Sequence, residues 1–331
     1  MISGSTTSKR TARRAPWLSW WQGHLALGLC LVYFIVLAPL VPGFASRENL
    51  QTIVAYLLPV LVAAVGSTIV LVPRGIDLSV TSIIAVCSVL GGRVMSIDGG
   101  WLGERPLIAA CVGPIVMVLA GGILGGFNGL AVAVCRIPAF MATLTSMMFL
   151  SGLAIWSTQS QKIGGLPTGF IFLGNNLAAA FAIAIVAAAG AHLLLERTIL
   201  GRWLRATGYN PSTATVSGVP VRIVTFLSFV AGGLCAGLAS VLFTAALETA
   251  NPEMARDNLL DIIGAVVIGG TSLHGGRGRI SGTVFGVLFL ALVDNSLNLV
   301  GLSFYAITMI KGAIILGAAL IDTLQSSARR S

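Results

Sequence analysis

Ten apolar stretches, nine of them about twenty residues long, occupy most of this 331-residue chain. A helix needs about 20 apolar residues to cross roughly 30 Å of hydrocarbon. Backbone N–H and C=O groups that face lipid must form their hydrogen bonds within the protein. For stretches this long and apolar, only a helix meets that requirement. Hydrophobic residues make up 56% of the chain and charged residues only 9%, outside the range of soluble domains. The sequence therefore predicts an all-α polytopic membrane protein with about ten transmembrane helices.

The predicted spans are residues 23–41, 50–72, 76–97, 107–134, 139–157, 170–195, 223–247, 259–270, 280–300 and 305–324. They divide the chain into an amino-terminal tail (1–22), a transmembrane domain (23–324) with one long polar loop (196–222), and a carboxyl-terminal tail (325–331). The eighth stretch is too short to cross alone, so we expect it to be extended at its ends or to be a broken helix covered by protein.

Orientation follows from the distribution of lysine and arginine. Placing the amino terminus inside puts fourteen of the twenty basic residues on the cytoplasmic side, and the long loop alone carries four arginines and no lysine. An even number of crossings then returns the carboxyl terminus to the cytoplasm. This asymmetry and the attraction of anionic lipid headgroups explain the net charge of +9. A nucleic-acid partner is not indicated.

The first span has a second interpretation. Basic residues precede it, and Gly43-Phe44-Ala45 resembles a signal-peptide cleavage site. The apolar run is longer than the core of a signal peptide, which favours a retained helix, but removal of this segment would leave the other nine spans unchanged. The five cysteines lie in or beside apolar stretches without metal-ligand spacing, so we predict neither a metal site nor a disulfide framework.

Motifs of catalysis are missing from the sequence. No Gly-x4-Gly-Lys-Ser/Thr loop occurs anywhere, so the chain has no recognisable nucleotide site of its own. The three histidines are scattered, and no Ser/His/Asp or paired-carboxylate arrangement is evident. We therefore predict no catalytic residue and no cofactor bound by this chain.

Polar residues inside predicted spans are functional candidates because they are costly in a membrane. Asn128, Asp294, Asn295 and Asn298 stand out, with Lys311 one helix later. One interpretation of the acid and the lysine is an interhelical ion pair. A titrating carboxylate would instead suit an ion-coupled secondary transporter, which remains the alternative. The two asparagines at 128 and 295 lie at comparable depths from opposite membrane faces, which suggests an inverted repeat of helices 2–5 and 7–10.

A short helix is predicted within the long polar loop. Asn210 can cap it, Pro211 suits its first position, and residues 212–217 supply about two turns before Gly218 ends it. A helix this short is unstable alone in water, so the loop or a partner protein must support it. We expect a partner to dock there, with Ala214 on the docking surface.

Several motifs follow one another in order over most of the chain. They are Gly75-Ile76-Asp77-Leu78-Ser79-Val80, Gly201-Arg202, Gly208-Tyr209-Asn210, Ser217-Gly218-Val219, Ala265-Val266-Val267-Ile268-Gly269-Gly270-Thr271-Ser272-Leu273 and Gly275-Gly276-Arg277-Gly278. In this order and spacing, from about residue 50 to 322, the chain resembles the permease subunit of ribose-type sugar ABC importers. It departs from the family's usual Gly-Gly-Ile-Asp-Leu-Ser-Val-Gly at Arg74 and Thr81.

The resemblance implies a ten-helix permease in the bacterial inner membrane that translocates a sugar or related polyol. The implied partners are a cytoplasmic ABC ATPase, which uses the ATP, a second permease subunit, identical or paralogous, and a periplasmic sugar-binding protein. The short loop helix becomes the coupling helix; its coupling residues are Gly208, Asn210, Pro211, Ala214 and Gly218. A branched-chain amino-acid permease remains an alternative, against which the sugar-type glycine turn weighs.

Two inner turns are predicted to be structural. Asp77 begins the third span beside Ser79, where its carboxylate can cap free N–H groups. Gly275, Gly276 and Arg277 form a tight turn between spans eight and nine, and no strand precedes them as a phosphate loop would require. The translocation path is expected between two permease subunits. Its candidate lining residues are Asn128, Asp294, Asn295 and Asn298, and helix-to-helix hydrogen bonding is the competing role for the asparagines.

Overall fold

The computed structural model describes residues 16–327. Its helices are α1 (Pro16–Leu37), α2 (Arg47–Leu71), α3 (Val80–Met95), α4 (Pro106–Ala133), α5 (Ala139–Thr158), α6 (Thr168–Asn175), α7 (Leu177–Arg197), α8 (Ile199–Tyr209), α9 (Pro211–Val216), α10 (Val221–Ala246), the 3-10 helix η1 (Arg256–Asn258), α11 (Leu259–Ile268), α12 (Ile280–Leu299) and α13 (Phe304–Ser327). Of the predicted tails, residues 1–15 and 328–331 lie outside the described residues, and residues 16–22 belong to α1.

Six of these helices are long and apolar enough to cross a membrane: α2, α4, α5, α7, α10 and α12. Shorter apolar helices lie at Ala26–Leu37, Val80–Met95 and Phe304–Leu320. Within residues 16–327 there is no strand, and a single pair of backbone hydrogen bonds joins Ile163 to Ala250 between two loops. The predicted class, an all-α polytopic membrane protein, is confirmed.

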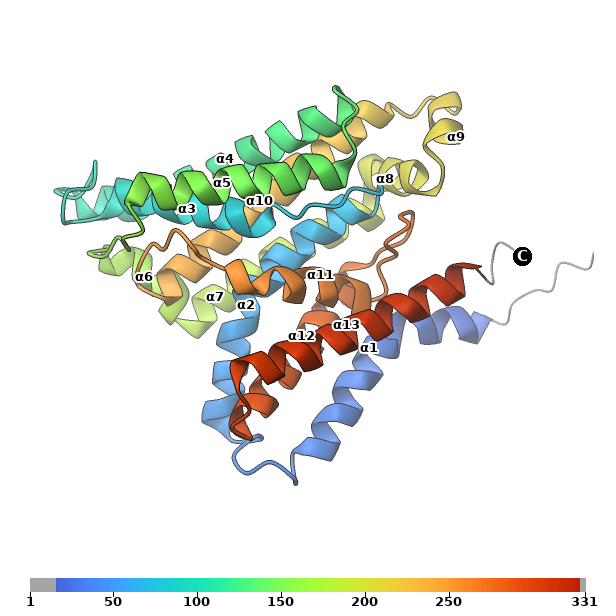
Figure 1. Ribbon diagram of the computed structural model, residues 1–331, viewed down its shortest axis with the longest axis horizontal. Coiled ribbons are helices and arrows are strands. Elements are labelled where there is room, and N and C mark those ends of the chain that lie inside the picture. Colours follow the sequence, from blue (N-terminus) through green and yellow to red (C-terminus); the bar gives the residue numbers. More distant parts are fainter. Residues whose placement is uncertain (1–15, 328–331) are drawn as a thin grey trace, which may run out of the picture.

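Helix α10 packs most extensively against α4, and next against α2 (Figure 1). Glycines lie where α10 and α4 approach each other closely. A Cβ on Gly121 would lie 2.3 Å from the carbonyl oxygen of Gly233, and a Cβ on Gly233 would lie 2.2 Å from that of Gly121. Because no side chain fits at such distances, the two backbones approach as closely as they do only with glycine at both positions. Small residues at such positions let membrane helices pack closely against each other.

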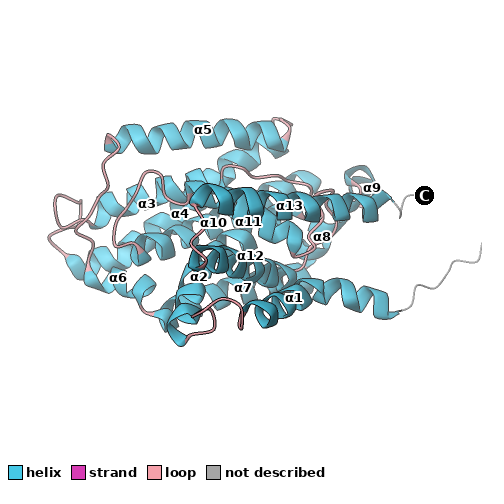
Figure 2. Cartoon of the chain, turned by 60° about the horizontal axis from the view of Figure 1, so that its bottom comes forward, coloured by secondary structure: helices cyan, strands magenta, loops and turns pink. Residues whose placement is uncertain are grey.

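Helix α12 forms a second close pair with α11, where a Cβ on Gly286 would lie 2.0 Å from the carbonyl oxygen of Ala265. It also contacts α1 and α2. Helix α5 lies along one side of the bundle, where it contacts mainly α3 and α4 (Figure 2). Most of the α5 surface is therefore left for lipid or for another chain.

Two predicted spans have different boundaries in the structure. The span 170–195 is wrong as one helix, since α6 ends at Asn175 and α7 begins at Leu177. Asn176 has an extended backbone, and its Oδ1 accepts a hydrogen bond of 3.0 Å from the N–H of Ala179, which caps α7. The third span begins at Val80 rather than at residue 76, because side-chain hydrogen bonds hold the preceding residues in a turn.

The eighth span is short, as predicted, since α11 has ten residues and extends about 15 Å. The long polar loop contains more structure than expected. Helix α8 was missed, although Thr198 offers the usual signal for its start: its Oγ1 accepts a hydrogen bond of 3.1 Å from the N–H of Gly201. An ion pair between Arg205 and Glu196 joins α8 to the end of α7.

Candidate functional site

The short helix α9 forms where the capping residues predict it. Asn210 Oδ1 accepts a hydrogen bond of 3.1 Å from the N–H of Thr213, and Pro211 occupies the first helical position. Gly218 ends the helix with a φ of 83°, in the left-handed region that favours glycine. Because the N–H of Val219 also bonds to the carbonyl of Ala214, α9 is anchored at both ends within its own loop.

The expected docking role of Ala214 is wrong in one respect. Its side chain is only 4% exposed and packs in the core of this chain, so it is not available to a partner. Two turns of helix place one face inward and the rest outward. Val216, two residues further, is 90% exposed, an apolar side chain held on a firmly capped helix. Sequence reasoning missed Val216 because a six-residue helix is too short to show which face is buried.

Arg74 connects the loop between α2 and α3 to the end of α8. Its Nε donates a hydrogen bond of 2.7 Å to the carbonyl oxygen of Gly208, and its Nη2 donates one of 2.8 Å to that of Tyr209. These are terminal carbonyls of α8, where a cation is favoured by the helix dipole. Arg74 itself has a φ of 71°, an uncommon conformation for a residue with a side chain. The departure from the family motif at this position therefore forms a specific contact.

Gly208 lies where three segments meet. A Cβ on it would be 2.0 Å from the carbonyl oxygen of Val72 and 2.3 Å from the backbone nitrogen of Gly276. The N–H of Gly276 in turn donates a hydrogen bond of 2.8 Å to the same carbonyl of Val72. We call this convergence of the α2–α3 loop, the α8–α9 corner and the glycine turn the inner junction.

The glycine turn has the tight geometry that the sequence predicts. Gly275 and Gly276 have φ of 78° and 79°, and the N–H of Ser272 bonds to the carbonyl of Arg277 across the turn. The side chain of Arg277 is exposed. The structure thus brings Gly208, Gly275 and Gly276 together at the base of α9.

Asp77 holds the adjoining turn. Its Oδ1 accepts hydrogen bonds from the backbone N–H of Ser79, at 2.9 Å, and from the Ser79 hydroxyl, at 2.5 Å. Asn128 of α4 donates a further hydrogen bond of 2.7 Å to that hydroxyl. The expected cap is therefore displaced: Asp77 accepts hydrogen bonds from Ser79, the residue before α3, rather than from N–H groups in the first turn of the helix. Asn128 is 3% exposed and bonded to this turn, and its role in a path stays a prediction.

Asn295 forms a reciprocal amide pair with Asn49 at the start of α2. The two side chains exchange N–H···O bonds of 2.8 and 2.9 Å. Asn298, one turn later on α12, donates from Nδ2 to the Asp294 carbonyl at 2.8 Å and to the Asp294 carboxylate at 3.1 Å. These contacts are of the helix-to-helix and within-helix kind, and a path role for either asparagine stays a prediction.

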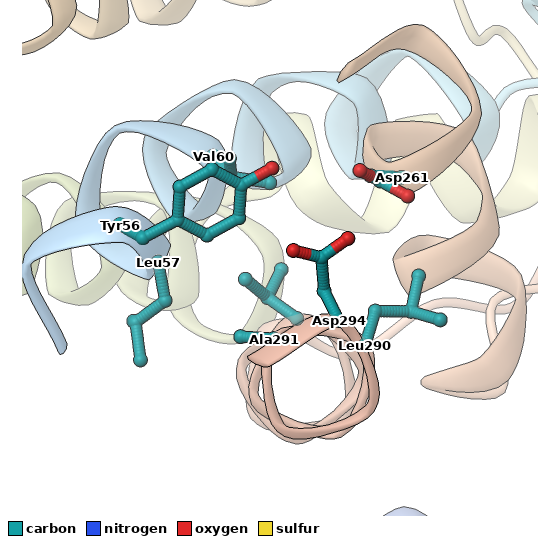
Figure 3. Close-up of a pocket in the computed structure, with 8 residues that line it drawn as sticks. Tyr56, Leu57, Val60, Asp261, Leu290, Ala291 and Asp294 are labelled. Atoms are coloured by element: carbon teal, nitrogen blue, oxygen red, sulfur yellow. The ribbon is translucent and has the colours of Figure 1, made fainter. Parts of the chain in front are cut away.

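The acid and lysine predicted to pair do so, with a third member. Lys311 Nζ lies 2.8 Å from Asp294 Oδ1 and 3.0 Å from Asp261 Oδ2. Figure 3 shows the two carboxylates, from α12 and α11, facing the same small space as the Tyr56 hydroxyl of α2. Asp261 was missed, although an aspartate inside the apolar run of α11 is itself the signal of an intramembrane polar site. We call Tyr56, Asp261, Asp294 and Lys311 the charge cluster.

These features have different chemical capacities. The inner junction is a mechanical connection, because Gly208 and Tyr209, just before α9, contact the loop between α2 and α3 and the glycine turn between α11 and α12. The charge cluster can bind polar groups. Among the described residues, no group of three or more His, Cys, Asp or Glu side chains could hold a metal ion.

Comparison with known proteins places these features in context. The family described as "Branched-chain amino acid transport system / permease component" matches residues 49–319. The chain is 32% identical to the ribose import permease protein RbsC of Escherichia coli strain K12, over 96% of this chain and 98% of that protein. It is 35% identical to RbsC of Bacillus subtilis strain 168, over 91% and 92% of the two chains. It is 31% identical to the L-arabinose transport system permease protein AraH of E. coli strain K12, over 94% and 93%. No solved structure matches.

Proposed function

This chain belongs to the family of permease components typified by the branched-chain amino acid and ribose systems, and we propose that it is the membrane-spanning subunit of an ATP-driven importer of a monosaccharide. Three relatives of 31–35% identity, each matched over more than nine-tenths of its length, are ribose or arabinose permeases. The family description names branched-chain amino acids, but these relatives support a sugar.

The chain is a transport subunit without its own ATPase site. ATP hydrolysis takes place in a cytoplasmic ABC ATPase, and a periplasmic binding protein delivers the sugar. A second permease subunit completes the path in this proposal, and both chain termini lie in the cytoplasm, as the distribution of basic residues favours. The alternative of an ion-driven carrier that uses Asp294 has less support, because that carboxylate pairs with Lys311.

The observation that carries the coupling part of the proposal is the position of Gly208. Gly208 lies so close to the backbones of Val72 and Gly276 that the end of α8 cannot move toward either loop without displacing it. Those loops begin α3 and α12, and α2 and α11 lead into them. A movement that the ATPase imposes on α9 would therefore reach four membrane helices directly.

The test is uptake by proteoliposomes that contain the chain with its ATPase and binding protein. A panel of radiolabelled monosaccharides, including D-ribose and L-arabinose, is compared with L-leucine, with ATP or ADP enclosed. We expect ATP-dependent uptake of at least one sugar, no uptake of leucine, and no effect of a protonophore. Leucine uptake alone would establish the amino-acid alternative. Uptake that needs an ion gradient and no ATP would establish the secondary carrier.

A further inference from the structure

A cavity of about 420 Å³ opens beside the charge cluster, between α2, η1, α11, α12 and α13. Small-ligand sites commonly measure about 300–1,000 Å³, so this volume suits a small molecule. Its polar lining converges from four separate helices and the 3-10 helix. The polar and charged lining residues are Tyr56, Arg256, Asp257, Asn258, Asp261, Asp294, Asn298, Thr308 and Lys311.

One buried atom in this lining has no partner. Among the described residues nothing hydrogen-bonds to Asp261 Oδ1, although the side chain is only 8% exposed. An unsatisfied buried carboxylate oxygen is unfavourable, so it calls for a donor. The smaller space that Asp261 shares with Tyr56 and Asp294 is about 10 Å³ (Figure 3), enough for one water at most. The larger cavity, which the same three residues help to line, can hold a bigger donor.

The cavity offers hydrogen-bond donors and acceptors together. The Lys311 ammonium has three donors and uses two of them on Asp261 and Asp294, which leaves one. Within residues 16–327, Asp261 Oδ1 accepts no hydrogen bond, and Asn298 bonds to Asp294 through Nδ2, which leaves its amide oxygen as a second acceptor. A hydroxyl group both donates and accepts, so adjacent hydroxyls of one sugar match this mixture.

The charge of the lining favours a neutral ligand over an anion. Three carboxylates, at Asp257, Asp261 and Asp294, face two cations, at Arg256 and Lys311, which leaves one negative charge in excess. A phosphate or a carboxylate anion would be repelled. Ring surface is also available, because Tyr56 and Phe304, which are 40% and 58% exposed, line this cavity. The apolar face of a sugar ring can lie on such surfaces.

We propose that this cavity is a weak binding subsite for the hydroxyl groups of a monosaccharide, with Asp261 as its principal acceptor. The inference rests on the proposed sugar import and names the side chains that the sugar meets. In the proposed orientation the cavity lies at the periplasmic end, where the loops before α11 and α13 lie, so the sugar meets it on entry. Binding is weak because a site on a transport path must also release its ligand.

The first test is Asp261→Asn in the complete importer. This variant leaves Lys311 paired one-to-one with Asp294, so a merely structural cluster should keep its stability and its uptake. The subsite predicts unchanged thermal stability but a maximal uptake rate about tenfold lower, since one charged acceptor is lost. The matched control is Glu48→Gln, an exposed acid at the same end and outside the cavity lining. Normal uptake in Asp261→Asn would overturn the proposal.

The second test detects the ligand directly. Thr308→Cys is placed in the cavity lining, and Thr52→Cys serves as control, because Thr52 is exposed on α2 outside the lining and makes the same bond to the carbonyl four residues earlier. Both are made in a chain without its five native cysteines and treated with a small hydrophilic thiol reagent. The sugar that the wild type transports should slow labelling at position 308 only. Adding Asp261→Asn should remove this protection.

The outcomes separate the two proposals. If the wild type transports no monosaccharide of the panel, the proposed function fails. If it transports one but that sugar does not protect position 308 in any nucleotide state, or position 308 never labels, the subsite is overturned and the import function stands. Protection by L-leucine and not by the sugar would also overturn it.

Discussion

Arg74 Nε donates a hydrogen bond of 2.7 Å to the carbonyl oxygen of Gly208, 134 residues further along the chain. The bond joins the loop that precedes α3 to the helix that leads into α9. A second hydrogen bond, from Nη2 to the carbonyl oxygen of Tyr209, attaches the same side chain to the next residue. Because Arg74 adopts a φ of 71°, the chain maintains an unfavourable backbone conformation at the residue that makes this attachment.

Two substitutions weaken or remove the hydrogen bonds of Arg74 without introducing a larger side chain. Arg74→Gly relieves the backbone conformation but loses both hydrogen bonds, and Arg74→Lys keeps the charge but not the planar fork. We expect both variants to insert normally, with sugar uptake per ATP hydrolysed reduced several-fold, since hydrogen bonds from an exposed cation are worth about 1 kcal/mol each. The control is Arg136→Gly. Arg136 also has a positive φ, of 58°, and its side chain makes no hydrogen bond within residues 16–327. An unchanged ratio would show that Arg74 has no part in coupling.

Gly208→Ala should break the inner junction. The added methyl group would lie 2.0 Å from the carbonyl oxygen of Val72, and the backbone groups around it cannot rotate away. We expect the α8–α9 corner to separate from both loops and uptake to fall at least tenfold. Gly190→Ala is the matched control, because a Cβ there meets nothing within 4 Å. Equal uptake and ATPase activity in the two variants would contradict the role of the junction.

Val216 is predicted to contact the ATPase. Val216→Asp should weaken ATPase binding at least tenfold without lowering the thermal stability of the isolated permease, because the side chain is 90% exposed. Ala214→Asp should instead lower that stability, since it buries a charge. Ser217→Asp, at the end of α9, controls for added charge. Co-purification of the ATPase in detergent measures the binding, and full recovery with Val216→Asp would exclude this surface.

Substitutions of Asp77 test whether a single side-chain oxygen that accepts hydrogen bonds from Ser79 is enough to hold the turn before α3. Asp77→Asn keeps an Oδ1 that accepts from Ser79, so folding and uptake should be largely retained. Asp77→Leu loses both bonds and should destabilise the chain by about 0.5–2 kcal/mol. Ser79→Ala separates the contributions, because it removes the hydroxyl bonds and leaves the backbone one. Thermal unfolding in detergent checks the order, and identical behaviour of Asn and Leu would show that capping is not the reason.

The path predicted at Asn128 and Asn295 has a labelling test. Each is replaced by cysteine in a chain without its five native cysteines, and a hydrophilic thiol reagent is applied in the apo, ATP and ADP states. A path residue should label, with a rate that changes with the nucleotide. The contacts to Ser79 and Asn49 predict slow labelling in the state described here. If neither position labels in any state while uptake is normal, both asparagines serve packing.

The sequence alone was sufficient for features that depend on neighbouring residues. Apolar length determines where a helix can cross the bilayer, so all of the predicted spans except 170–195 correspond to single helices. The α9 helix follows from Asn210, Pro211 and Gly218, because a cap and a left-handed stop act over three or four residues. The break at Asn176 is equally local, and its capping residue was available to be read.

Only the tertiary structure decided which distant groups meet. Asp261 and Lys311 are 50 residues apart, and Arg74 and Gly208 are 134 apart. Their spacing in sequence contains no information on contact, since that depends on how α8, α11 and α13 pack. The same reason applies to Ala214, whose burial depends on what lies beneath a helix of six residues. Local chemistry determines the elements, and packing between remote elements determines which side chains are hidden, paired or left free to bind.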